Sequence, residues 1–205
     1  MAEDAPAVPI AHSPFPIARI GVYCGSNSGT NPAYARAARE LGALLGARGI
    51  GLVYGGGKVG LMGVVADAAL AAGAEVIGVI PEALRAREVG HTGLTELRVV
   101  ETMHERKAVM EDLSDAFVAL PGGLGTLDEL FEILTWAQLG MHRKPCGLLD
   151  VEGFFAPLVA YLDHATTEGF VRPQHRAMMM VDADAERLLE RFAEYQAPAL
   201  GKWVR

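Results

Sequence analysis

The stretch AFVALPGGLGTLDELFEIL (residues 116–134) joins an apolar run to a helical pattern through a turn rich in glycine. Residues 116–121 predict a buried β-strand, and residues 127–140 predict a helix. Gly122, Gly123 and Gly125 stand between the two, with Thr126 at the expected start of the helix. Backbone N–H groups in such a turn, together with the Thr126 hydroxyl, can point at a single phosphate. This stretch therefore predicts a strand–turn–helix unit that can hold an anion.

The same alternation of apolar runs and helical patterns extends along the chain in both directions. Further strands are expected at residues 17–25, 51–55, 75–81, 97–101, 146–151 and 178–182. Further helices are expected at residues 32–48, 103–114, 154–169 and 185–195, with an Ala-rich one ending near Gly73 and a loop over residues 82–96. Such alternation is typical of a parallel sheet covered by helices on both faces, and right-handed crossovers make it doubly wound.

The chain is therefore expected to form one α/β domain over residues 17–196, with a single, mostly parallel sheet. Residues 1–16 are interpreted as a mobile tail and residues 197–205 as a second tail. Ligands in doubly wound folds bind at the carboxyl ends of the strands. The loops at residues 25–31, 55–63, 81–90 and 121–129 all follow predicted strands, so we expect them to converge on one crevice.

Residues 55–60, GGGKVG, contain a second glycine pattern, G-x-G-x-x-G, between a strand and a helix. This context favours contact with a phosphate, although the glycines could instead serve tight turns and helix–strand packing. A dinucleotide site would need an acid after the next strand, and Glu82, which follows Pro81, is a poor candidate. Val59 after Lys58 excludes a Walker A motif.

Two alternatives stay open for the charged residues near these loops. Thr126 and Glu129 fit a T-x-x-E capping box, which would need no ligand. Arg106 and Lys107 fall in the first turns of a helix, where the dipole disfavours cations. They are either solvated surface charges or partners of an anionic ligand that offsets this cost.

Composition limits the function classes. The 205 residues carry a net charge of −7 without a basic stripe, which argues against binding of polymeric nucleic acid. There is no apolar run long enough to span a membrane and no secretory signal. Cys24 and Cys146 form no CxxC and are interpreted as buried free thiols of a cytoplasmic protein. The six histidines show no metal-ligand spacing, so no metal site is expected.

Several motifs together resemble the Lonely Guy family, the cytokinin riboside 5′-monophosphate phosphoribohydrolases. They are Tyr54–Gly57, Met103–Lys107, PGGLGTLDE (121–129), TWAQLG (135–140) and Lys144–Pro145. The resemblance runs from about Ile17 to Tyr195. It implies a Rossmann-like homodimer that hydrolyses N6-modified adenosine monophosphates to free base and ribose 5-phosphate. No cofactor is expected. The name lysine decarboxylase, used for many relatives, has no support in this sequence.

The resemblance makes Arg106 and Glu129 the catalytic pair. With the two glycine loops, the expected substrate contacts are Ser26, Gly55, Gly56, Gly57, Glu88, Lys107, Gly122, Gly123, Gly125, Thr126 and Asp128. The helix that ends at residues 136–141 is expected at the core or near the dimer seam. Departures from the common family pattern, which leave base preference open, are Asn27, Lys58, Leu124 and Arg143.

The chemistry gives each catalytic residue a role. Cleavage of an N-glycosidic bond creates an oxocarbenium-like ribose. A carboxylate such as Glu129 can stabilise this cation, orient the ribose hydroxyls or activate water. Arg106 cannot act as a general acid, so its expected role is electrostatic. The proton donor to the base stays open between Asp128 and water. The main alternative function is a non-catalytic nucleotide or cofactor carrier; a nicotinamide-dependent oxidoreductase and a pyridoxal-phosphate decarboxylase are less favoured.

Overall fold

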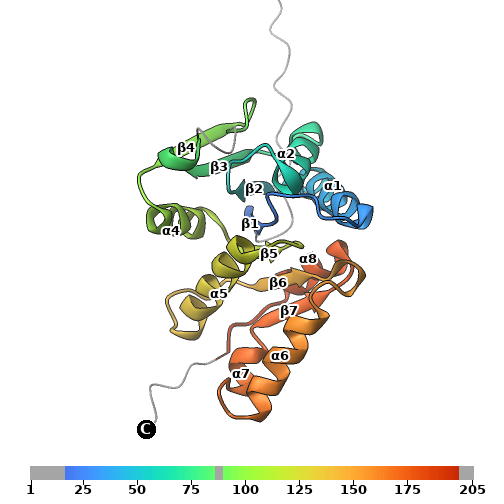
Figure 1. Cartoon of the computed structure of the whole chain (residues 1–205), viewed down its shortest axis with the longest axis vertical. Coiled ribbons are helices and arrows are strands. Elements are labelled where there is room, and N and C mark those ends of the chain that lie inside the picture. The colour runs from blue at the N-terminus through green and yellow to red at the C-terminus, as the bar shows by residue number, and fades with distance from the viewer. Residues whose placement is uncertain (1–16, 86–89, 199–205) are drawn as a thin grey trace, which may run out of the picture.

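The computed structural model describes residues 17–85 and 90–198, which form one seven-stranded sheet (Figure 1). The strands are β1 (Arg19–Tyr23), β2 (Gly51–Tyr54), β3 (Val76–Pro81), β4 (Glu96–Val100), β5 (Ala116–Ala119), β6 (Cys146–Leu149) and β7 (Met179–Asp182). Their order in the sheet is β4-β3-β2-β1-β5-β6-β7, and every neighbouring pair is parallel. The predicted doubly wound α/β fold is confirmed.

Helices connect the strands. They are α1 (Pro32–Ala47), α2 (Gly60–Ala71), α3 (Glu82–Arg85), α4 (Met103–Leu113), α5 (Leu124–Gln138), a 3₁₀ turn at Val151–Gly153, α6 (Ala156–Thr167), α7 (Pro173–Arg176) and α8 (Ala185–Ala193). The longer ones lie where the pattern predicted; α3, α7 and the 3₁₀ turn were not predicted. Asn31 caps α1 by accepting a hydrogen bond from the Ala33 amide at 2.9 Å, and Pro32 follows as the first helical residue. None of the helices in the described ranges is long and apolar enough to cross a bilayer.

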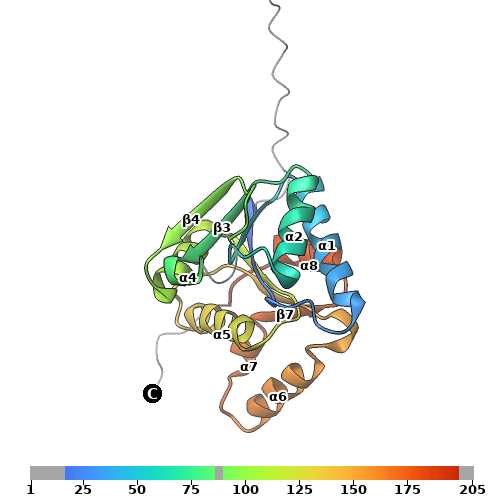
Figure 2. The ribbon, with the colours of Figure 1, turned by 45° about the horizontal axis from the view of Figure 1, so that its top comes forward.

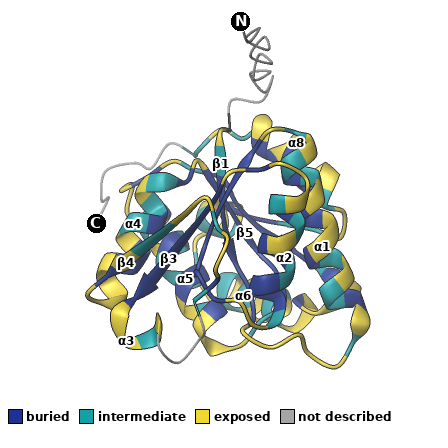
Figure 3. Cartoon of the chain, turned by 90° about the horizontal axis from the view of Figure 1, so that it is seen from above, coloured by how far each residue is buried: buried dark blue, intermediate teal, exposed yellow. Residues whose placement is uncertain are grey.

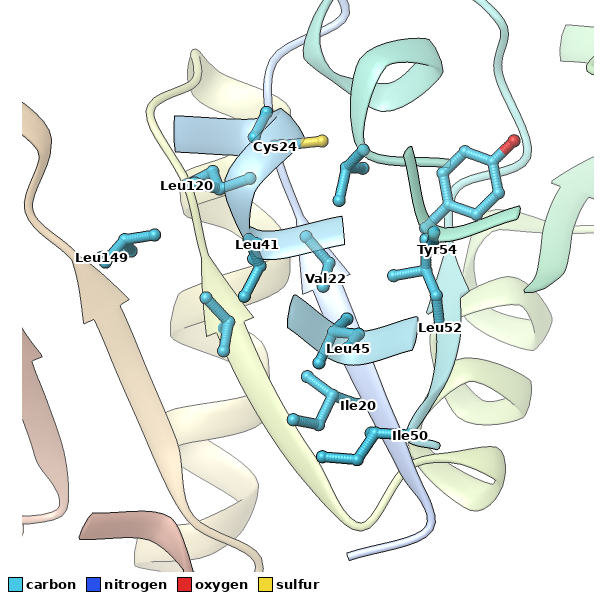
Figure 4. Packing of buried hydrophobic residues seen from close by; sticks show 14 of the residues in the cluster. Ile20, Val22, Cys24, Leu41, Leu45, Ile50, Leu52, Tyr54, Leu120 and Leu149 are labelled. Carbon is cyan, nitrogen blue, oxygen red and sulfur yellow. The ribbon is translucent and has the colours of Figure 1, made fainter. Parts of the chain in front are cut away.

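Apolar residues alternate between the two faces of the central strands, which explains why helices cover both. Ile20 and Val22 of β1 point into a core with α1, α2 and α8, while Tyr23 points into a core with α4 and α5. Figure 2 shows α1, α2 and α8 grouped on one side of the sheet, with α4, α5 and α6 on the other. Figure 4 shows Leu41 and Leu45 of α1 packed over β1 and its neighbours. Burial on both faces accounts for the near-continuous apolar strands.

The buried residues lie between the sheet and the helices that cover it. Figure 3 shows the central strands as buried, the edge strand β4 as partly exposed, and the outward sides of the covering helices as exposed. Cys24 and Cys146 are buried and carry no disulfide, so the predicted buried thiols are confirmed. The expected tails lie outside the described residues except for residues 197–198.

Three local predictions need correction. The expected loop after β3 begins with a short helix, α3, across which Arg85 and Glu82 form an ion pair of 3.0 Å. Residues 151–153 leave the sheet as a 3₁₀ turn, so the expected helix from residue 154 begins at Ala156. The helix after β5 begins at Leu124, three residues early, because Gly123 takes the extended cap conformation. This last shift changes the role of Glu129, as described below.

Candidate active site

A cleft of about 420 Å³ opens where the loops after β1, β2 and β5 meet. In the sheet order the chain runs outward from β1 to β4 on one side and from β5 to β7 on the other. The cleft therefore lies at the switch point, where doubly wound folds bind their ligands. Of the four loops expected to converge here, the loops at 25–31, 55–63 and 121–129 contribute wall residues.

The N-terminus of α5 opens into this cleft. Gly123 occupies the cap position without a side-chain hydrogen bond, and the first turn holds no acidic residue. Gly123, Leu124 and Gly125 are exposed, and no atom lies within 4 Å of the place where a Cβ would stand on either glycine. The first amides of a helix lack partners within the helix and lie at the positive end of its dipole. This end of α5, with the amides of residues 123–126, therefore suits a phosphate group and is named the phosphate cradle.

Glycines hold the loops around this cradle tightly together. A Cβ on Gly122 would lie 2.1 Å from Thr126 Oγ1, so any other residue would displace the threonine. The Gly25 amide donates to the Pro121 carbonyl at 3.1 Å, and the Leu61 amide donates to the Gly25 carbonyl at 3.0 Å. The three loops are thus tied to one another through their backbones.

Arg106 and Glu129 meet on the wall of the cleft. Arg106 Nη1 lies 2.8 Å from Glu129 Oε1, and both side chains are about nine-tenths buried (10% and 9% exposed). Arg106 Nε donates to the Val79 carbonyl of β3 at 3.1 Å. The guanidinium is thus held by a strand on one side and by α5 on the other.

The start of α4 shows how the sequence places a cation in a first helical turn. Thr102 caps the helix by accepting from the Glu105 amide at 3.1 Å, and Glu105 Oε2 accepts from the Glu101 amide at 2.8 Å. Glu105 therefore supplies the negative charge that the helix dipole favours at this end. The alternative of solvated surface charge for Arg106 and Lys107 is wrong, because both residues are buried.

Gly55, at the end of β2, leaves the space that the guanidinium occupies. A Cβ at this position would lie 2.3 Å from Arg106 Nη2 and 3.2 Å from Met62 Sδ. The missing side chain therefore sets how closely Arg106 approaches β2.

Cys24 also lines the cleft, as a buried free thiol. Burial first, and then the negative charge of Glu129, raise the pKa of Cys24 well above its ordinary value. The same two causes raise the pKa of Tyr23. Since a thiol must ionise to act as a nucleophile, this shift disfavours nucleophilic attack by Cys24.

The structure separates the expected contact residues into two groups. Those that line the cleft are Ser26, Gly55, Arg106, Gly122, Gly123, Gly125, Thr126 and Glu129. Those that are described but lie away from its walls are Gly56, Gly57, Lys107 and Asp128. Glu88 lies outside the described residues. The capping-box alternative is wrong, because Thr126 lies inside the first turn and Glu129 turns to Arg106.

Gly56 and Gly57 occupy packing positions. Gly56 has a positive φ of 76°, and a Cβ there would lie 3.2 Å from Ile80 Cβ. Gly57 pairs with Gly90 in an isolated antiparallel bridge, and the His91 amide donates to the Gly56 carbonyl at 3.0 Å. The glycine loop at residues 55–60 therefore supports the segment at Gly90–His91.

The sequence did not indicate an apolar wall of the cleft. Tyr34 of α1 and Phe154, from the turn before α6, form an edge-to-face pair with ring centroids 5.5 Å apart, and both line the cleft with Leu124. Leu124 is 87% exposed. Residues 34 and 154 lie far apart in the sequence and in no shared motif, so no local signal could have joined them.

The described residues lack the side-chain groupings that bind metal ions. Within residues 17–85 and 90–198, no three His, Cys, Asp or Glu side chains are grouped as metal ligands would be. His142 is buried with hydrogen bonds to Ile133 O (2.8 Å) and the Lys144 amide (3.1 Å), and burial lowers its pKa.

Comparison with known structures identifies the same architecture in other proteins. The molybdenum cofactor binding protein of Rippkaea orientalis superposes with a TM-score of 0.65 at 22% identity, covering 86% of this chain and 95% of that one. The molybdenum cofactor carrier protein of Chlamydomonas reinhardtii gives a TM-score of 0.63 at 22% identity, with 86% and 96% covered. At this level of identity the likeness establishes the fold alone.

Sequence comparisons identify much nearer relatives. Residues 62–192 match the model of a family described as "Possible lysine decarboxylase". The cytokinin riboside 5′-monophosphate phosphoribohydrolase LOG of Oryza sativa subsp. japonica is 51% identical over 86% of this chain and 73% of its own length. The phosphoribohydrolase of the same description from Rhodococcoides fascians is 49% identical over 82% of this chain and 85% of its own length. This chain therefore belongs to the Lonely Guy family, the cytokinin riboside 5′-monophosphate phosphoribohydrolases.

Proposed function

We propose that this chain hydrolyses the N-glycosidic bond of adenosine 5′-monophosphates, including N6-modified ones, to free base and ribose 5-phosphate. The observation that carries the proposal is the Arg106–Glu129 pair, 2.8 Å apart on the wall of a cleft into which the uncapped end of α5 opens. The printed activity of relatives at about half identity supports the same reaction.

The arrangement suggests how each group acts. The 5′-phosphate binds the amides of Gly123–Thr126 at the α5 N-terminus, which orients the sugar along the helix toward Glu129. Glu129 stabilises the positive charge that develops on the ribose as the bond to the base breaks, and orients the attacking water. Arg106 stabilises negative charge on the nucleotide. The water hydroxyl joins C1′ of the ribose, and a proton joins the base nitrogen.

Of the two candidates for the proton donor, water is favoured over Asp128. The Asp128 carboxylate lies 3.2 Å from Lys107 Nζ and does not line the cleft.

The lysines argue against decarboxylation by a Schiff base. The chain has four lysines, and such chemistry needs one that contacts the substrate. Lys58 is exposed, Lys107 and Lys144 form ion pairs, and none of these three lines the cleft, while Lys202 lies outside the described residues.

The deciding experiment incubates the full chain separately with AMP and with N6-isopentenyl-AMP and separates the products by chromatography. Hydrolysis releases free base and ribose 5-phosphate in equal amounts. Recovery of bound but intact nucleotide would instead support the non-catalytic carrier. Comparison of kcat/KM between the two nucleotides measures the base preference.

Replacing Gly55 by Ala is expected to lower kcat/KM by about ten- to a hundred-fold, because the added methyl displaces the Arg106 guanidinium. The group that must move is the end of a flexible side chain, so the free energy of unfolding should change by only about 1 kcal/mol. Steady-state kinetics and urea unfolding on one preparation test both parts. Gly123→Ala, where a Cβ meets no atom within 4 Å, is the matched control for fold stability. Full activity of Gly55→Ala would show that this close approach does not matter.

The chain is also proposed to act as a homodimer in the cytoplasm. Leu139 and Met141 follow α5 and are 51% and 66% exposed, as expected of a surface that a second copy covers. Sedimentation should give twice the chain mass of 21.8 kDa, and Leu139→Lys with Met141→Lys should shift the equilibrium toward monomer. A mass of one chain at micromolar concentration would contradict the dimer.

The two buried free thiols favour a reducing compartment, which supports the proposed cytoplasmic location.

A further inference from the structure

Lys107 follows Arg106 directly but faces away from the cleft. Its side chain is 10% exposed, and its Nζ lies 2.9 Å from Glu132 Oε2 and 3.2 Å from Asp128 Oδ2. Both carboxylates belong to α5, and Lys107 is absent from the cleft wall. The residue expected to contact substrate is therefore placed between two helices.

The two adjacent cations of α4 form ion pairs with carboxylates at different positions around α5. Asp128 and Glu132 are four residues apart, and Glu129 lies about 100° round the helix from Asp128 and about 60° from Glu132. Lys107 binds Asp128 and Glu132, and Arg106 binds Glu129. Figures 1 and 2 both show α4 and α5 side by side over the same face of the sheet. Ion pairs at separate angles around the helix restrain the rotation of α5 as well as its distance from α4.

This rotation matters because α5 carries both halves of the proposed site. Its first turn presents the amides of the phosphate cradle, and its second turn presents Glu129. Burial lowers the pKa of Lys107, but the hydrogen bonds that its ammonium donates to Glu132 and Asp128 outweigh this effect, so that the net pKa is raised. The ammonium therefore stays charged over the whole range in which such an enzyme would be assayed.

We infer that Lys107 is a positioning residue: by bridging to Glu132 and Asp128 it sets the rotation of α5 that brings Glu129 to Arg106 beside the phosphate cradle. The inference rests on the proposed hydrolysis of nucleoside monophosphates. It assigns to Lys107 no contact with substrate, and it makes Glu132, which lies outside the cleft wall, matter for turnover.

A double-mutant cycle with Lys107→Met and Glu132→Met tests this, with kcat and KM measured for N6-isopentenyl-AMP. Each single variant should lower kcat by about ten-fold while KM stays within about two-fold, because the geometry of the reacting groups is disturbed and the cradle amides remain. The double variant should be no slower than Lys107→Met alone, since that change already removes the ion pair that Glu132→Met removes. Lys107→Arg should restore most of kcat.

Lys144→Met is the matched control. It removes the ion pair between Lys144 Nζ and Glu111 Oε1 of α4, which are 2.5 Å apart. Neither residue lines the cleft, so kcat should stay unchanged. Circular dichroism of every variant checks the fold, and Lys107→Gln with Glu132→Gln replaces the methionine variants if those do not fold.

A ten-fold rise in KM for Lys107→Met, with no effect of Glu132→Met, would show direct substrate contact and overturn the inference. Strictly additive effects of the two changes would overturn it as well. Absence of hydrolysis by the unmodified chain on AMP and on its N6-isopentenyl derivative would reject the proposed function itself, and the inference with it. Failure of the inference alone leaves the unmodified chain active.

Discussion

Replacing Glu129 by Gln is expected to lower kcat for nucleotide hydrolysis by about 10²-fold or more, while nucleotide affinity stays close to that of the unmodified chain. The amide keeps the size of the side chain and one acceptor oxygen toward Arg106, 2.8 Å away in the native pair. It loses the negative charge that stabilises an oxocarbenium-like ribose. Single-turnover kinetics and calorimetric titration with N6-isopentenyl-AMP measure the two quantities separately.

Asp112→Asn provides the control for Glu129→Gln, since it makes the same carboxylate-to-amide change on an exposed residue of α4. Turnover by that control should match the unmodified chain. Near-normal turnover by Glu129→Gln would remove Glu129 from the reaction. Loss of folding would instead give it a mainly structural role in the buried pair.

Replacing Arg106 by Ala is expected to depress kcat/KM by about 10²- to 10³-fold, because the charge that stabilises the transition state is lost. It should also lower the free energy of unfolding by about 3 kcal/mol, since the buried Glu129 loses its close cationic partner. Arg106→Lys should recover part of the stability and less of the activity. A lysine keeps the charge but cannot donate to the Val79 carbonyl and to Glu129 with the same fork.

Arg39→Ala, an exposed arginine of α1, is the control for Arg106→Ala and should change neither kinetics nor unfolding. The two readouts come from urea titration and steady-state kinetics at a temperature where all variants are folded. An unchanged kcat/KM in Arg106→Ala would leave the arginine a structural role only.

The fold was within reach of the sequence because its signals are local. Alternating burial along β1 and β5 produced apolar runs, and Asn31–Pro32 marked the start of α1 as the structure shows it. The glycine turn after β5 likewise indicated an anion cradle, and the uncapped helix start is found there. Such features depend on a few neighbouring residues and on the period of the chain, which a sequence displays directly.

The direction of side chains was beyond those local signals. The shift of the α5 start from residue 127 to Leu124 turned Glu129 from a capping partner to the partner of Arg106. Lys107 and Arg106 are neighbours in sequence, yet a helix turns about 100° per residue, so one faces the cleft and the other does not. Gly56 and Gly57 satisfied a phosphate-binding pattern, but the returning segment at Gly90–His91 covers them.

The sequence by itself thus determined the doubly wound architecture and the family, and the family resemblance named the two charged residues on which the proposed chemistry depends. Only the tertiary structure decided which residues share the cleft: it brought Tyr34 and Phe154 together as an apolar wall and set Lys107 between α4 and α5. The reason is physical, since strand and helix formation follow from short-range preferences. The walls of a cleft are instead set by packing between segments that lie far apart along the chain.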